Sequence, residues 1–167
     1  MNAIANTTVI SNFASIGQIE LLRRIFGVLY ISTEVYEEIQ AGLEEGYTFY
    51  TCLDAHLHPQ VETGWIRLTS IADERELLLF SRLPSRLHQG ESSCLAIASC
   101  RNWLMLTDDR AARQEATRLG IRVSGSVGCL VVAIERGLCT VEQANVWLSK
   151  MIQIGYRSPV SDLHSLL

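Results

Sequence analysis

The hydrophobic and polar positions of the chain change several times between a strand-like and a helix-like spacing. Short apolar runs rich in β-branched and aromatic residues predict strands, and apolar residues three or four positions apart predict helices. The predicted strands cover residues 4–10, 28–31, 64–68, 103–107 and 121–123. The predicted helices cover residues 16–26, 34–43, 73–84, 90–100, 111–119, 127–136 and 141–154. Strands and helices therefore alternate along the chain.

Residues 44–60 are the one stretch without a clear spacing. They contain three aromatic residues and a His58–Pro59 step, and we interpret them as a helix or a lid whose role is open. The proline is expected to end a helix at this step, because a proline ring does not continue one. Elsewhere the helix ends carry capping signals, such as Ser32 before one helix and Thr140 before the last.

The alternation predicts a single domain over residues 1–167 with a three-layer α/β/α fold. Parallel strands need helical crossovers between them, and these helices cover both faces of the sheet. We expect a central parallel sheet of about five strands. In such folds, ligands bind at the carboxyl ends of the strands, so polar residues that follow strands are the candidates for a site.

Composition limits the partners and the compartment. The net charge is −4, with 18 acidic and 14 basic residues, so any nucleic-acid binding must be local. All the basic residues except Lys150 are arginines, which suit phosphate recognition. The five cysteines form no C-x-x-C pair, which argues against a disulfide framework or a zinc ribbon. Without a secretory pattern or a run of about 20 apolar residues, we expect a cytoplasmic protein that does not enter a membrane.

Acidic and amide residues occur near the predicted strand ends or in the helices that follow. They are Asn6, Glu38, Glu91, Asp108 and Asp109. Each acid alone could complement a helix N-terminus or a solvated helix face, although capping by one aspartate of the 108–109 pair leaves the other without a structural task. Brought together at one edge, the carboxylates would repel one another unless a hard cation such as Mg²⁺ or Mn²⁺ neutralised them. Their joint pattern predicts a shared metal site.

Other chemistry has weaker support. The pair His56 and His58 lacks a further ligand at a suitable spacing, and Ser92–Ser93 lacks the glycines of a nucleophile elbow. No glycine-rich nucleotide motif is present. A phosphoacceptor receiver domain would need a well-placed lysine, and the only one, Lys150, lies in the last long predicted helix.

A series of short motifs resembles the successive signatures of PIN-domain proteins, in the family's order and over about residues 1–140. The motifs are Asn6-Thr7-Thr8-Val9-Ile10, Ile19-Glu20-Leu21-Leu22, Val35-Tyr36-Glu37-Glu38-Ile39, Gly90-Glu91 leading to Ala96-Ile97-Ala98, Leu106-Thr107-Asp108-Asp109-Arg110 with Ala112-Arg113, and Gly125-Ser126-Val127-Gly128. The resemblance is to bacterial and archaeal PIN proteins of the toxin–antitoxin type or to their relatives.

The resemblance implies a metal-dependent endoribonuclease that uses Mg²⁺ or Mn²⁺. Carried onto this sequence, Glu38, Glu91 and Asp109 match the family's catalytic acids, and Asp108 lies beside them. A metal at these residues would activate a bound water and offset charge on the phosphate oxygens. Arg110 and Arg113 are weaker candidates for holding the phosphate. Single-stranded or structured RNA, an antitoxin protein and a second copy of the chain are the partners that the resemblance implies.

Asn6 departs from this pattern, because the family normally has an aspartate at the end of the first strand. A neutral amide is a weaker ligand for a hard cation than a carboxylate. We therefore expect a weakened metal site at Asn6, Glu38, Glu91, Asp108 and Asp109. The alternative is a catalytically decayed PIN-like module that binds RNA or a protein partner.

Overall fold

The central element of the fold is a sheet of six parallel strands, which a computed structural model describes together with the rest of residues 1–167. The strands are β1 (Ala3–Ala5), β2 (Leu29–Ser32), β3 (Leu57–His58), β4 (Ile66–Thr69), β5 (Leu104–Leu106) and β6 (Val123–Ser124), and their order across the sheet is β3-β4-β2-β1-β5-β6. The prediction of a three-layer fold with a parallel sheet is confirmed, and the sheet has one strand more than expected.

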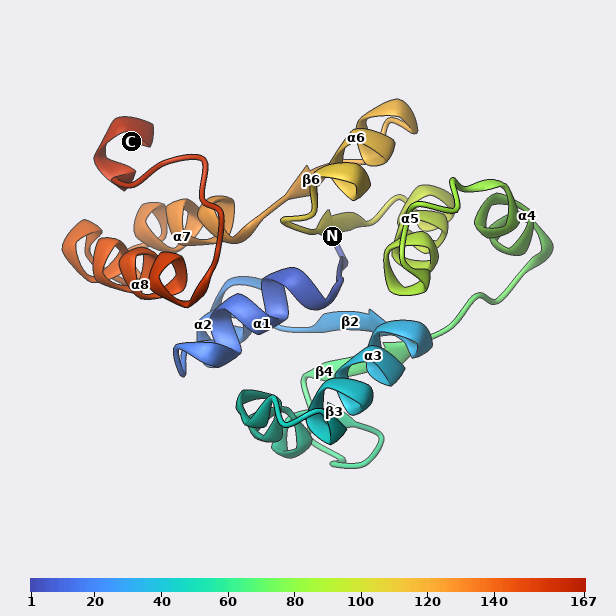
Figure 1. Ribbon diagram of the computed structural model, residues 1–167, viewed down its shortest axis with the longest axis horizontal. Coiled ribbons are helices and arrows are strands. Elements are labelled where there is room, and N and C mark those ends of the chain that lie inside the picture. The colour runs from blue at the N-terminus through green and yellow to red at the C-terminus, as the bar shows by residue number, and fades with distance from the viewer.

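The helices form two layers (Figure 1). They are α1 (Thr7–Ser15), α2 (Ile19–Phe26), α3 (Thr33–Glu44), α4 (Glu74–Arg82), α5 (Gln89–Arg101), α6 (Arg110–Arg118), α7 (Ser126–Glu135) and α8 (Val141–Ile154), with the 3-10 helices η1 (Thr48–Ala55) and η2 (Leu163–Leu166). Helices α1, α2, α7 and α8 pack together, whereas α5 packs against α3, α4 and α6 and against strands β1, β2 and β5. No helix is long and apolar enough to span a lipid bilayer.

The predicted strand at residues 4–10 was largely wrong. Only Ala3–Ala5 form β1, and α1 begins at Thr7 because Asn6 acts as its N-cap. The β-branched run Thr7–Ile10 favours a strand locally, but Val9, Ile10 and Phe13 are fully buried when the segment is helical. Tertiary burial therefore outweighs local propensity here.

Residues 44–60 also differ from the prediction. They form the 3-10 helix η1 and then the edge strand β3, so the His58–Pro59 step ends a strand rather than a helix. This short strand is the sixth of the sheet. The proline follows its last residue, where it removes no hydrogen bond from within the strand.

The predictions for most other helices are confirmed. Ser32, Asp73 and Thr140 each cap a helix with a side-chain oxygen that accepts from a backbone N–H three residues later. Helix α8 has the predicted bounds, and α4 ends before Pro84. These ends were predictable because the signal is local.

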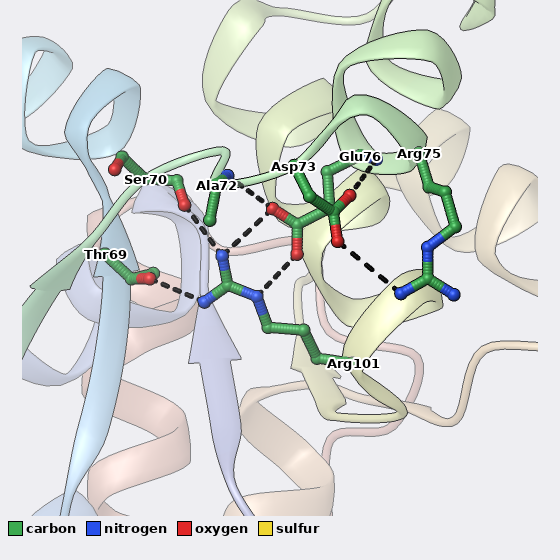
Figure 2. A network of polar contacts seen from close by, with 7 residues as sticks. All are labelled: Thr69, Ser70, Ala72, Asp73, Arg75, Glu76 and Arg101. Carbon is green, nitrogen blue, oxygen red and sulfur yellow. Dashed lines mark hydrogen bonds and ion pairs between the residues drawn. The ribbon is translucent and has the colours of Figure 1, made fainter.

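A buried ion pair joins α4 to the C-terminal end of α5 (Figure 2). The Arg101 guanidinium donates from Nε to Glu76 Oε1 at 2.6 Å and from Nη2 to Oε2 at 3.0 Å. It also donates to Thr69 Oγ1 and to the Ser70 carbonyl, both at the end of β4, while the Ala72 N–H donates to Glu76. Arg101 holds the pKa of Glu76 below its usual range, although burial opposes this effect. This network, the Glu76–Arg101 clamp, fixes α5 relative to the sheet.

Candidate functional site

The candidate site lies where the carboxyl ends of β1, β2 and β5 meet. Asn6 follows β1, Glu38 lies in the helix after β2, and Asp108–Asp109 follow β5. Because β1 pairs with both β2 and β5, these segments are neighbours. The N-terminus of α5, which carries Glu91, joins them through a hydrogen bond from Gly90 to Glu38.

Asn6 is buried, and the oxygen of its amide is fully engaged within the protein. Its Oδ1 accepts from the Thr8 N–H at 3.2 Å and from the Thr8 hydroxyl at 2.7 Å. Its Nδ2 donates to Thr107 Oγ1 at 2.8 Å. An amide oxygen has two lone pairs, so both are used and the carbonyl of Asn6 has none left for a cation.

Glu38 reaches the first turn of α5. Its Oε1 accepts from the Gly90 N–H at 2.9 Å, while the Thr7 hydroxyl lies 3.5 Å from Oε2. This approach requires glycine at position 90, because a Cβ atom there would lie 2.7 Å from both carboxylate oxygens. The glycine of the Gly90–Glu91 motif therefore leaves the space at the helix N-terminus that the Glu38 carboxylate occupies.

Glu91 is a buried acid in the same turn. Its Oε2 accepts from the His88 N–H at 2.9 Å in a capping box. Burial raises the pKa of Glu91, and the negative charges of Asp109 and Glu38 raise it further, against the lowering effect of the His88 N–H. Glu91 therefore lies close enough to Asp109 and to Glu38 for their negative charges to act on it.

Asp109 caps α6, and Thr107 connects it to Asn6. Asp109 Oδ1 accepts from the Ala112 N–H at 2.8 Å. The Asp109 N–H donates to Thr107 Oγ1 at 3.1 Å, the atom that also accepts from Asn6. A single buried threonine hydroxyl thus links the ends of the two neighbouring strands β1 and β5.

Asp108 has a different environment, and the expectation that one aspartate of the pair would lack a structural task was wrong. Its Oδ1 accepts from the Ser126 N–H at 2.9 Å and from the Tyr156 hydroxyl at 3.1 Å. Its Oδ2 accepts from Asn12 Nδ2 at 3.0 Å and from the Ser126 hydroxyl at 2.5 Å. Asp108 therefore caps α7 from another segment. Gly125 permits this contact, because a Cβ atom there would collide with the Asp108 carboxylate.

In each of the remaining three acids, one carboxylate oxygen accepts a hydrogen bond at a helix N-terminus and the other has no close donor. Glu38, Glu91 and Asp109 each place one carboxylate oxygen on a helix N–H. Their second oxygens have no donor closer than the Thr7 hydroxyl at 3.5 Å. Hard carboxylate oxygens of this kind suit Mg²⁺ or Mn²⁺.

Few acidic side chains come together closely enough to share a metal ion. No three Asp, Glu, His or Cys side chains are gathered so that they could hold a metal ion together. Mg²⁺, however, is usually bound by one or two carboxylates plus water and substrate phosphate rather than by a complete protein cage. The donor chemistry at Glu38, Glu91 and Asp109 fits such an ion, while Asn6 and Asp108 have no free side-chain oxygen.

Arg110 and Arg113 lie beside the acids, at the start of α6. Arg113 donates from Nη1 to the Thr107 carbonyl at 3.0 Å, and both arginines line a cavity of about 610 Å³ next to Asp108. Neither forms an ion pair with an acidic residue. Their positive charges are therefore not paired with an acidic side chain of the protein.

Four polar partners of the site were not predicted from the sequence. They are Asn12, Thr107, Ser126 and Tyr156. Thr107 and Ser126 fall inside recognised motifs, but Asn12 and Tyr156 have no local signal, since they meet Asp108 from 96 and 48 residues away. Burial raises the pKa of the Tyr156 hydroxyl, and the charge of Asp108 raises it further, so the hydroxyl remains a donor to this aspartate.

The fold and the site define a parallel α/β domain with an acidic cluster at the carboxyl edge of its sheet. The chain belongs to the PIN domain family, because residues 2–167 match the family model DUF3368, described as a PIN domain. Proteins of this family are generally nucleases. The resemblance to PIN-domain proteins that the sequence motifs indicated is thus confirmed for the family as a whole.

Comparison with solved structures gives a more distant likeness. The chain is similar to a PilT N-terminus domain protein from the hyperthermophilic archaeon Sulfolobus solfataricus P2, with 14% sequence identity and a TM-score of 0.48. The alignment covers 81% of this chain and 95% of that one. No curated protein matches the sequence.

Proposed function

We propose that this protein is a divalent-metal-dependent endoribonuclease of the PIN type with a weakened metal site. The observation that carries the proposal is the free second oxygen on each of Glu38, Glu91 and Asp109, whose other oxygens are fixed to helix N-termini. Such fixed carboxylates can bind a cation without first losing much side-chain freedom. The family assignment supports the same class of chemistry.

Each residue has a distinct task in this proposal. Glu91 and Asp109 would hold the ion, and its positive charge would offset the burial and the neighbouring negative charges that raise the pKa of Glu91. Glu38, held by Gly90, would add negative charge beside the ion. A bound Mg²⁺ or Mn²⁺ would lower the pKa of a water molecule and offset charge on the phosphate. Arg110 and Arg113 orient the RNA backbone.

Asn6 accounts for the weakening. It keeps the N-cap of α1 and the link to Thr107, but it adds no negative charge to the acidic cluster. Fewer anionic ligands lower the affinity for a hard divalent cation. The enzyme should therefore need more metal than a site with an aspartate at position 6.

The test is cleavage of labelled single-stranded RNA over a range of Mn²⁺ concentrations. The wild type is compared with Asp109→Asn, which keeps the helix cap and removes the charge, and with Glu142→Gln, an exposed acid in the first turn of α8, as the matched control. Activity in the wild type and the control, but not in Asp109→Asn, supports the proposal. Equal activity in all three would point to a contaminating nuclease and refute it.

A second candidate function is a catalytically decayed module that binds RNA or a protein partner. The occupied amide oxygen of Asn6 favours it, together with the lack of three converging metal ligands. It requires that wild-type protein cleaves nothing at millimolar Mn²⁺. If Asn6→Asp then cleaves RNA, only the chemistry has been lost and the second candidate is correct.

A further inference from the structure

Two cavities adjoin the acidic cluster and share a wall. The larger has a volume of about 790 Å³ and lies between α1, the start of η1 and the C-terminal end of α8 with the residues that follow it. The smaller, of about 610 Å³, lies between α6, the start of α7 and the same C-terminal segment. Asp108, Arg110, Tyr156 and Arg157 line both. We refer to the larger cavity as the aromatic cavity and to the smaller one as the arginine cavity.

The aromatic cavity is neutral and has one exposed and one half-buried ring. Tyr47 and Phe49 line it, with ring centroids 5.9 Å apart and planes tilted by 38°. The Tyr47 residue is 53% exposed, which is high for a large aromatic residue beside a cavity. Two arginines of the lining are balanced by Asp108 and Asp109. Such a compartment suits a flat, uncharged aromatic group.

The arginine cavity has the opposite character. Arg110, Arg113 and Arg157 line it, and Asp108 is its only acidic residue. Four donors already occupy the carboxylate of Asp108. None of the three arginines forms an ion pair with an acid of the chain. With three arginines against one aspartate, the cavity has an excess of positive charge, although the whole protein carries a net charge of −4.

We propose that the two cavities together bind one unpaired nucleotide of an RNA strand, with its base on Tyr47 and Phe49 and its phosphate on Arg110, Arg113 and Arg157. The proposal rests on the proposed function and names the feature of the substrate that the site selects. Stacking on an aromatic side chain and an arginine contact to the backbone are the two interactions that bind single strands without sequence preference. Here they occur in adjoining compartments, one neutral and one positive.

The site selects against paired RNA. In a duplex, neighbouring bases cover both faces of each base, so a ring such as Tyr47 has no face on which to stack. Unstacking a base within a duplex costs free energy, whereas the bases of a single strand are already accessible. The short distance between the cavities, which share the Tyr156 and Arg157 wall, suits a base and a phosphate of the same chain.

The experiment measures binding without cleavage. A fluorescein-labelled ten-nucleotide oligouridine is titrated with protein in EDTA at low salt, and anisotropy gives Kd. We expect Tyr47→Ala to weaken binding by at least about fivefold and Tyr47→Phe to leave it nearly unchanged, because the ring rather than the hydroxyl makes the contact. Arg157→Gln should weaken binding and lower the slope of log K against log salt by about one. Arg82→Gln, at an exposed arginine on α4, is the matched control and should bind normally.

Further arms separate the alternatives. A duplex of the same length should bind more weakly than the single strand, and equal binding would overturn the proposal. Displacement of the oligonucleotide by micromolar uridine monophosphate would assign the site to a free nucleotide and also overturn it. Normal binding by Tyr47→Ala and Arg157→Gln, with RNA cleavage intact, would refute this inference and leave the proposed function standing. Loss of binding in both variants supports it even if no cleavage is found.

Discussion

Replacing Glu76 with alanine would leave the Arg101 guanidinium in the clamp without its carboxylate partner. Glu76 is only 2% exposed, and three donors reach its two oxygens at 2.6, 2.6 and 3.0 Å. The Arg101 side chain is 23% exposed, so water can only partly replace the lost contacts. The Ala72 N–H would lose its acceptor as well (Figure 2).

Removing one partner of a buried ion pair costs about 3–5 kcal/mol. The partial exposure of Arg101 places the expected loss near the lower end, at about 3 kcal/mol in the free energy of unfolding, or roughly 150-fold in the folding equilibrium constant. Replacing both partners, as in Glu76→Leu with Arg101→Met, should recover most of this loss because no unpaired charge remains.

Urea unfolding at pH 7 measures the effect. The matched control is Glu20→Ala, which breaks an exposed ion pair with Arg23 at 3.1 Å and should cost less than about 1 kcal/mol. Since the pKa of Glu76 is lowered in the folded protein, its contribution is present above its unfolded pKa of about 4.3 and is lost as the pH falls through the folded value. A loss in Glu76→Ala no larger than in Glu20→Ala, or no recovery in the double variant, would refute the reasoning.

Three further predictions concern the site. Asn6→Asp should fold normally, because the Thr107 hydroxyl can turn to donate to the new carboxylate. The added charge should lower the Mn²⁺ concentration for half-maximal RNA cleavage by at least about tenfold, and an unchanged metal requirement would contradict this. Gly90→Ala should change the free energy of unfolding by no more than about 1 kcal/mol. It should reduce cleavage by about 100-fold, because the alanine Cβ displaces the Glu38 carboxylate; undiminished cleavage would exclude a role for Glu38. Because burial raises the pKa of Glu91, Glu91→Gln without metal should be more stable than wild type at pH 7, with the difference vanishing below about pH 4, where the acid is protonated in both states. Thermal melts check this, and a Glu91→Gln protein less stable than wild type at pH 7 would contradict it.

The sequence predicted those parts of the fold that depend on local signals. Asp73, Ser32 and Thr140 are caps whose effect extends only three residues, and the helices after them were predicted correctly. The first strand was predicted too long because the β-branched run at Thr7–Ile10 favours a strand locally. Its burial against other elements, which no local pattern reveals, makes it helical.

The candidate site was predicted in outline for a topological reason. Parallel strands place their carboxyl ends at one edge, so residues after β1, β2 and β5 had to meet there. The division of tasks within the Asp108–Asp109 pair was not predictable. It depends on Ser126, Asn12 and Tyr156, which reach Asp108 from distant segments, and sequence spacing contains no information about which carboxylate they choose.

The use of these polar side chains as helix caps restricts how the edge can change in evolution. Asparagine caps a helix as well as aspartate does, and glutamine can replace glutamate in a capping box, whereas alanine costs about 1 kcal/mol at a cap. A gene released from selection for cleavage would therefore drift from acids to their amides before it lost the polar groups altogether. Asn6, which caps α1 with its side-chain oxygen, is an amide of the kind that such a route permits. A chain of this family can thus lose charge at the carboxyl edge of its sheet and still keep the cap of α1.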